Sequence, residues 1–357
     1  GDMPKIAGIG WRNNGQIVLN SSERVVPQER MDIDMPGYAW DLLPYKNKPF
    51  DMYRAPLWHA DFQDQYKTPF AALYTSLGCR FKCDFCMINI VNRTDYSDDV
   101  PSNKSNFMRY WSPELMLKEF DKLQEHGVNT VRLVDEMFFL DKRYYEPLLK
   151  GLYERGYGEK LRMWSYSRVD TLRKEYLELF RKAGMRWFCL GIEAASQNIR
   201  REVTKGTFQE VNIRKVIQEA READINIIAN FMFGLPEDTL ETMQQTLDLG
   251  LELCTEMWNG YACMALPGSP LYYEAKKQNM KMPDSYAGYG FLSYDCQPMA
   301  TKYLTAAEIM QFRDNAFEKY VNYQPYLDLV QKKFGQNAMD NIAGLKAVKL
   351  KRKILGD

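Results

Sequence analysis

Short apolar or β-branched runs alternate with helical stretches along most of this chain, and the alternation limits the folds open to it. The intervening stretches repeat apolar residues at helical spacing and mostly end in Gly or a charged residue. Strands that alternate with helices form parallel sheets with helical crossovers. Six strands are predicted, at 71–78, 130–135, 161–167, 187–192, 226–233 and 257–264.

Six such units predict an α/β fold, a partial (βα)6 TIM-like barrel. No GxGxxG or GxxxxGKS/T sequence follows any predicted strand, so neither a dinucleotide-binding fold nor a phosphate-loop nucleotidase is supported. We divide the chain into an N-terminal linker arm at 1–68, the barrel at 69–280 and a C-terminal helical extension at 281–357. The arm is rich in turns, with one short strand expected at 16–19, and the basic run at 346–353 is interpreted as a solvated helix end.

Charge and composition argue against several classes of partner. Lys plus Arg equal Asp plus Glu at 47 each, so no long-range field favours nucleic acid, and we expect no nucleic-acid partner. The chain lacks an apolar run of about 18 residues and a signal peptide, which predicts a cytoplasmic protein without a membrane span. Seven cysteines, an odd number, are expected to be reduced, with any cluster of them serving metal binding or catalysis.

Three of the cysteines stand within eight residues, in the segment SLGCRFKCDFC directly after the first predicted strand. A CxxxCxxC loop can wrap Cys79, Cys83 and Cys86 around three corners of a cubane iron–sulfur cluster and leave the fourth iron open. A structural zinc site needs a fourth protein ligand, whereas the other cysteines are isolated and the only histidines are His59 and His126. The spacing therefore favours an iron–sulfur cluster over zinc.

The same motif, with an aromatic residue just before its last cysteine, resembles the signature of radical S-adenosylmethionine (SAM) enzymes, whose fold is a partial barrel. The resemblance implies a 4Fe-4S cluster on the three cysteines and SAM chelated by the open iron. It also implies reductive cleavage of SAM to a 5′-deoxyadenosyl radical that takes hydrogen from an unactivated carbon. A flavodoxin-type or ferredoxin-type protein is the implied electron donor.

Further segments resemble family segments that border SAM. In GIEAASQ, Glu193 ends the fourth predicted strand on its lumen face, where it is placed to bond a ribose or ammonium group, although a plain surface carboxylate is the alternative. LVDEMFF contributes Asp135 and Glu136, and SYSRVD contributes Ser165 and Arg168. Arg168 is expected either to pair with the SAM carboxylate or to form an ion pair with Asp170.

Two more SAM contacts are expected. NFMFGLPEDT, which begins at Asn230, resembles the fifth-strand segment of the family, where backbone near Gly234 approaches adenine because glycine lacks a side chain. A strand-to-helix turn capped by Asp238 is the plainer interpretation. Phe85 either stacks on adenine or fills the core.

The strings PGYAWDLLP at 36–44, VTKG at 203–206, GLPEDT and LPGSPLYYEA at 266–275 resemble radical SAM proteins that carry an N-terminal cobalamin-binding domain. The chain opens Gly-Asp, and it lacks a DxHxxG motif, so we expect that domain to be absent from this chain. The resemblance implies radical carbon functionalisation of a small molecule, with cobalamin-dependent C-methylation first. The alternatives are a radical SAM enzyme without cobalamin and a non-catalytic, metal-stabilised scaffold.

Overall fold

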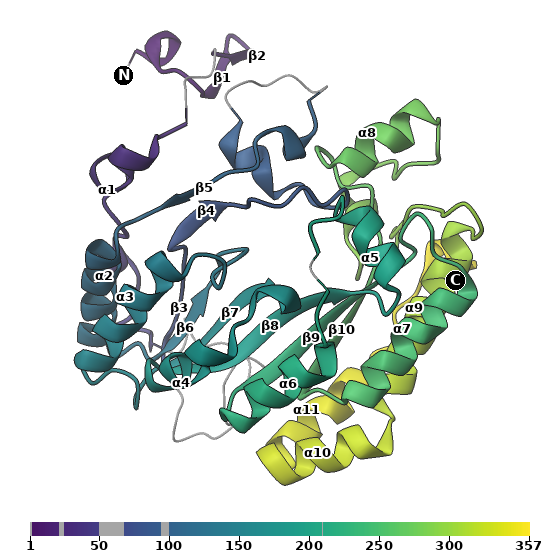
Figure 1. Ribbon diagram of the computed structural model, residues 1–357. Helices are drawn as coiled ribbons and strands as arrows, with labels where there is room; N and C mark the ends of the chain where they lie inside the picture. The colour runs from purple at the N-terminus through teal and green to yellow at the C-terminus, as the bar shows by residue number, and fades with distance from the viewer. Residues whose placement is uncertain (1, 21–24, 50–67, 94–99, 209) are drawn as a thin grey trace.

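The computed structural model describes residues 2–20, 25–49, 68–93, 100–208 and 210–357, and its centre is a six-stranded parallel sheet (Figure 1). The order along the sheet is β10-β9-β8-β7-β6-β3, and every neighbouring pair is parallel. The strands are β3 (Phe70–Leu73), β6 (Thr130–Leu133), β7 (Arg162–Arg168), β8 (Met185–Glu193), β9 (Asn226–Phe233) and β10 (Met257–Ala262). The predicted α/β fold is confirmed, and β3 and β10 are not paired with each other in the described part of the chain.

The first predicted strand, 71–78, is wrong as a single element. The chain leaves the sheet after β3 and forms a separate strand, β4 (Ser76–Gly78), which pairs antiparallel with β5 (Met108–Tyr110). The break follows from hydrogen bonds of the Thr75 amide and hydroxyl to the carboxylate of Asp135, at 3.0 and 2.7 Å. β4 therefore carries the chain above the sheet and into the cysteine loop.

Helices cover the outer face of the sheet, as Figure 1 shows. Outward residues of β8 pack among aromatic rings: Phe188 lies 4.5 Å from Phe139 and 5.4 Å from Phe180 between ring centroids. Phe188 of β8 therefore faces the covering helices. The helices that follow the strands are α2 (Pro113–Glu125), α3 (Lys142–Glu154), α4 (Leu177–Lys182), α5 (Gln197–Val203), α6 (Ile213–Glu222), α7 (Leu240–Leu253) and α8 (Pro270–Lys277).

Helix α7 begins with a capping box whose first residue is Thr239, one residue after the cap that the sequence predicted at Asp238. The cap is Thr239, whose side chain accepts from the Thr242 amide while Thr242 bonds back to the Thr239 amide. Asp238 instead braces the preceding turn, because its carboxylate accepts from the Leu235 amide at 2.9 Å and the Thr242 hydroxyl at 2.7 Å.

The N-terminal arm contains a short hairpin, β1 (Gly10–Asn13) with β2 (Gln16–Leu19), and the four-residue helix α1 (Met31–Asp34). β2 is the strand expected at 16–19, and β1 pairs with it across the turn at Asn14 and Gly15. The PGYAWDLLP segment clasps α2, since the Trp40 indole donates to the buried carboxylate of Glu119 at 2.8 Å. The motif therefore has a packing role in the described fold.

Three helices follow the barrel: α9 (Ala306–Val321), α10 (Gln324–Phe334) and α11 (Gln336–Ala347). α9 lies along β10, where the Arg313 side chain donates to the Gly260 carbonyl at 2.7 Å. The solvated interpretation of the basic run is wrong for Arg352, which is 0% exposed and bonds to Asp314 at 2.9 Å. No helix in the described ranges is long and apolar enough to cross a membrane.

Candidate active site around three cysteines

Cys79, Cys83 and Cys86 lie in the loop after β4, and all three are free thiols. The Phe81 amide points at the sulfur of Cys79 at 3.4 Å, and the Ile88 amide points at the sulfur of Cys86 at 3.5 Å. Backbone amides that face cysteine sulfur are a recurring feature of iron–sulfur sites, where they adjust the reduction potential.

Burial raises the pKa of each of the three thiols to about 12. The thiols also act on one another, because Cys83 raises the pKa of Cys79 and Cys86 raises that of Cys83. Burial in the loop therefore favours the protonated form of all three thiols. A bound metal centre supplies the positive charge that favours their deprotonation.

The donor set fits a cubane cluster better than a single ion. Among the side chains that the structure describes, no three His, Cys, Asp or Glu groups converge as the ligands of one metal ion do. The cysteines of a cubane bind separate iron atoms, so they need only line three sides of one space. Three thiols without a fourth protein ligand match a cluster with one open iron.

Two asparagines that the sequence interpretation missed support this loop. The Asn89 side-chain oxygen accepts from the Cys79 amide at 2.8 Å, and the Asn92 amide donates to the Phe107 carbonyl at 2.7 Å. Both side chains are buried. Gly78 has a φ of +85°, and a Cβ there would collide with the side chain of Asn92, which explains the glycine before the first cysteine. Buried asparagines just after the cysteine motif were the available signal.

Glu193 ends β8 with a left-handed backbone, φ +66°, which is uncommon for a residue with a side chain. Glu193 as a whole is 9% exposed, and burial raises the pKa of its carboxyl to about 7, partly offset by the charge of Arg168. Glu193 in turn raises the pKa of Cys83 and Cys86, so it lies in electrostatic range of the thiols. Strained backbone and a shifted pKa beside the cysteine loop are features of functional sites.

Arg168 ends β7 and has the ion pair that we expected as the alternative to a SAM contact. Its guanidinium donates to both carboxylate oxygens of Asp170, at 3.0 and 2.6 Å, and to the Thr207 carbonyl at 2.8 Å. It also lies over the ring of Phe81, 3.5 Å from the centroid, and its charge lowers the pKa of Cys83 against the effect of burial. Arg168 therefore lies close to the cysteine loop, and most of the hydrogen-bond donors of its guanidinium group already have partners in the protein.

The predicted SAM contacts after β6 and on β7 have different surroundings in the structure. The Asp135 carboxylate is 0% exposed and accepts from Thr75 and Ser76, which makes it a framework group. Glu136 is accessible although protein surrounds it, and burial raises its pKa to about 7. Ser165 pairs in register with Phe188, so by strand alternation it faces the helices and not the interior.

The remaining expected contacts also have definite positions. Asn230 faces the interior, where its oxygen accepts from Asn259 at 2.9 Å. Phe85 is half-buried and packs beside the apolar cluster that includes Leu235. Gly234 has a φ of +79°, and a Cβ there would lie 2.6 Å from Ile309, so packing of α9 alone requires the glycine.

Residues 73–250 match a family model described as the radical SAM superfamily. The chain belongs to this superfamily. The match begins in β3, includes the cysteine loop and ends in α7, so it contains the site just described. Membership of this superfamily implies a 4Fe-4S cluster and SAM, and the matched range contains the three free thiols of the loop.

Two curated relatives resemble most of this radical SAM chain. An uncharacterized methyltransferase of Pyrococcus horikoshii is 23% identical over 320 residues, 88% of this chain and 61% of the relative. The anaerobic magnesium-protoporphyrin IX monomethyl ester cyclase of Cereibacter sphaeroides is 26% identical over 319 residues, 88% of this chain and 46% of the relative. The chain thus spans about half the length of the curated relatives it matches.

A solved structure shows the same fold. OxsB, a cobalamin-dependent SAM radical enzyme with aqua-cobalamin and SAM bound, has a TM-score of 0.52 at 15% identity. The similarity covers 97% of this chain and 59% of that chain.

Two of the sequence segments that resemble the cobalamin-binding branch contact the cysteine loop directly. The Asp84 amide donates to the Val203 carbonyl at 2.8 Å, and the Leu271 amide donates to the Asp84 carbonyl at 3.0 Å. Lys205 forms an ion pair with the Asp84 side chain. VTKG and LPGSPLYYEA therefore hold the cysteine loop from two sides.

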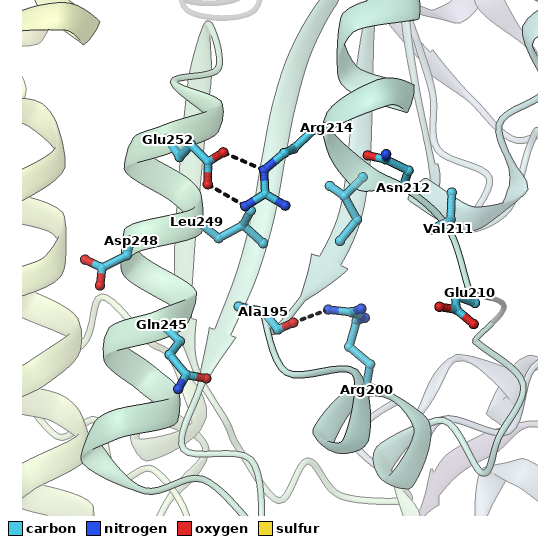
Figure 2. A pocket seen from close by; sticks show the side chains of 11 residues that line it. Ala195, Arg200, Glu210, Val211, Asn212, Arg214, Gln245, Asp248, Leu249 and Glu252 are labelled. Atoms are coloured by element: carbon cyan, nitrogen blue, oxygen red, sulfur yellow. Dashed lines mark hydrogen bonds and ion pairs between the residues drawn. The ribbon is translucent and has the colours of Figure 1, made fainter.

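Arg200 supports the turn after Glu193 from the outer side. Figure 2 shows its guanidinium bonded to the Ala195 carbonyl, at 2.7 Å, at the edge of a hollow of about 620 Å³ between α6 and α7. In the same view Arg214 pairs with Glu252. Neither pair was predicted from the sequence, since each depends on contacts between loops or helices.

Proposed function

We propose that this chain is the catalytic core of a radical SAM enzyme that functionalises an unactivated carbon of a small molecule, by cobalamin-dependent C-methylation. The observation that carries the proposal is the set of three free thiols in one loop, one buried and two half-buried, with Glu193 and Arg168 beside it. A relative named as a methyltransferase and a fold neighbour named as cobalamin-dependent support the choice of reaction.

Each residue has a stated task in this proposal. Cys79, Cys83 and Cys86 hold the 4Fe-4S cluster, which when bound supplies the electron that cleaves SAM. Glu193 and Arg168 orient SAM through its ribose, ammonium or carboxylate groups, with Phe85 and the Gly234 turn beside adenine. Asn230 and Glu136 face the interior and complete the polar lining. The surrounding sheet and helices exclude water from reactive intermediates.

Cobalamin would be contributed by a domain outside this chain, and a flavodoxin-type or ferredoxin-type protein would supply electrons. The test therefore uses the full-length protein, reconstituted anaerobically with iron and sulfide and reduced in the presence of SAM. We expect 5′-deoxyadenosine, tight binding of hydroxocobalamin, and loss of both iron and 5′-deoxyadenosine in Cys83→Ala. Cys254→Ser, which changes a half-buried cysteine outside the loop, is the matched control and should retain iron.

The leading alternative is radical chemistry without methyl transfer, which the relative named as a cyclase favours. Methyl transfer from SAM leaves S-adenosylhomocysteine, whereas hydrogen abstraction leaves 5′-deoxyadenosine. Turnover that yields 5′-deoxyadenosine alone, with no cobalamin bound, would select the alternative. No 5′-deoxyadenosine from wild type, together with equal iron in Cys83→Ala, would refute the radical SAM assignment of this site.

A further inference from the structure

The inner face of the sheet keeps accessible surface while its outer face is sealed. Inward positions on five strands are half-buried or exposed, namely Ala72, Arg132, Tyr166, Asn230, Asn259 and Tyr261. Their outward neighbours Leu73, Leu133, Phe231 and Trp258 are buried. The described side chains therefore leave space inside the sheet, where the expected barrel lumen lies.

The register of the parallel strands places Arg132 and Tyr261 on one face of the sheet, and their electrostatic interaction agrees with a sheet that curls around this space. Burial raises the pKa of Tyr261 on β10, and the positive charge of Arg132 on β6 counters part of that rise. The two strands are four strand spacings apart in the sheet order, which is roughly 19 Å in a flat sheet. A charge acts weakly over that distance in water, so the two side chains must face a common interior.

Arg132 differs from the other arginines of the interior. Within the described residues it forms no ion pair and no hydrogen bond, and its Nε is buried without a partner. Its guanidinium lies over the ring of Tyr166, with the guanidinium carbon 4.9 Å from the ring centroid. Every buried arginine of the described chain bonds to a carboxylate, an amide side chain or backbone carbonyls: Arg109, Arg168, Arg186, Arg200, Arg313 and Arg352.

A guanidinium without an anion is costly in such a place. Desolvation of a charge opposes folding unless a partner compensates, and an unpaired buried polar group calls for an explanation. The planar guanidinium group has five N–H donors, and their arrangement matches the oxygens of a carboxylate or a phosphate. The charge of Arg132 lowers the pKa of Glu136, but no hydrogen bond or ion pair joins the two side chains in the described structure. An anion that arrives with a ligand would supply the direct partner that Arg132 lacks.

We infer that Arg132, over Tyr166, binds an oxyanion of the substrate, a carboxylate or a phosphate, inside the sheet. The inference rests on the proposed function, since it takes this interior as the substrate site. The carboxylate of SAM is the other candidate, but the charges that act on the pKa values of the cluster thiols are those of Arg168, Glu136 and Glu193. Arg132 is not among the charges that act on the thiols; it acts on the pKa values of Cys189 and Tyr166, which lie deeper along the strands, and on that of Glu136.

A cavity of about 800 Å³ beside β10 offers space next to this interior. It is lined by Asn259 and Tyr261 of β10 and by Arg313 and Phe317 of α9. Its size is within the usual range for ligand sites, about 300–1,000 Å³.

The test uses two simple anions, propionate and inorganic phosphate, with the reconstituted full-length protein at constant ionic strength. We expect one or both to raise the melting temperature of wild type. Arg132→Met should lose about tenfold or more in affinity for that anion, as expected for a lost charge-assisted hydrogen bond, and Arg132→Lys should keep part of it. Arg214→Gln, which changes an arginine on the outer face already paired with Glu252, should respond like wild type. The anion that wild type binds more tightly shows whether the substrate oxyanion is a carboxylate or a phosphate.

A second measurement separates binding from packing. Without anion, Arg132→Met should melt at or above the wild-type temperature, because it removes an uncompensated charge. Equal anion affinity in Arg132→Met and wild type, or a lower melting temperature that Arg132→Lys restores without anion dependence, overturns the inference. So does weakened SAM binding with unchanged anion binding. Absence of 5′-deoxyadenosine from wild type would instead count against the proposed function, since anion binding is read out without turnover.

Discussion

The side-chain oxygen of Asn89 accepts a hydrogen bond from the backbone amide of Cys79 at 2.8 Å, and Asn89 is only 3% exposed. The first cysteine of the motif is therefore oriented by a residue ten positions later. The same asparagine donates to the Phe81 carbonyl at 3.4 Å, and the Phe81 amide points at the Cys79 sulfur. The loop is thus organised around its first sulfur by its own polar groups.

Asn89→Ala is expected to weaken retention of the cluster. The change leaves the Cys79 amide unpaired in a buried position, at a cost of about 1–3 kcal/mol, and frees the first sulfur to move. Iron and sulfide per chain after anaerobic desalting should fall below wild type. Asn106→Ala is the matched control, because Asn106 holds the same loop through an exposed bond to the Arg80 carbonyl at 3.0 Å. Equal iron in the two variants would contradict the orienting role of Asn89.

Asp135→Ala is expected to lower stability rather than SAM affinity alone. The Asp135 carboxylate accepts from the Thr75 amide and hydroxyl and from the Ser76 hydroxyl, all in a fully buried site. Its removal strands these donors and should lower the free energy of unfolding by roughly 3–5 kcal/mol. Chemical denaturation of the apoprotein measures this directly.

Glu136→Gln is the neighbouring control for that experiment. Burial raises the pKa of Glu136 to about 7, so its charged form is disfavoured in the folded protein. At pH 7 Glu136→Gln should therefore leave the free energy of unfolding of the protein unchanged or raise it. If Asp135→Ala unfolded at the wild-type denaturant concentration but bound SAM poorly, Asp135 would be a SAM ligand as the family resemblance implied.

These residues also mark the limit of what sequence patterns reveal. The parallel strands and the three cysteines could be predicted because periodicity and spacing are local properties. The break after β3 could not, since it depends on Asp135, some 60 positions away from Thr75. The orientation of Ser165 was open for a related reason: strand alternation tells faces apart, but a motif resemblance does not say which residues of SYSRVD face inward.

Gly234→Ala is expected to destabilise the protein by more than backbone strain alone. Any side chain at φ +79° costs roughly 1 kcal/mol, and the added Cβ would also lie 2.6 Å from Ile309 of α9. Gly156→Ala is the matched control, because Gly156 has a φ of +69° with nothing near its Cβ position. The excess loss of stability in Gly234→Ala measures the packing of α9 against the turn. Equal losses would mean that Ile309 moves away freely.

The contact between Asp314 and the C-terminal segment should depend on pH. Asp314 accepts from Arg313 at 2.7 Å and from Arg352 at 2.9 and 3.1 Å, and the Arg352 amide also donates to the Asp357 carboxylate at 2.7 Å. Burial acts to raise the pKa of Asp314, but the hydrogen bonds from Arg352 and Arg313 outweigh it and hold the pKa below its usual value. A carboxylate with a lowered pKa stabilises the folded state above its unfolded pKa of about 4, and that contribution disappears as the pH falls below it.

Asp314→Asn should therefore be less stable than wild type at pH 7, by about 1–3 kcal/mol, and the difference should shrink as the pH falls through 4 and below. The variant leaves the buried guanidinium of Arg352 without its charged partner at every pH, whereas wild type loses that partner only in acid. Denaturant unfolding of both proteins across this range measures the difference. Asp295→Asn is the control, since its 3.6 Å ion pair with Lys353 is exposed and should contribute little at any pH. A constant difference between wild type and Asp314→Asn would mean that Asp314 acts through shape and hydrogen bonding and not through its charge.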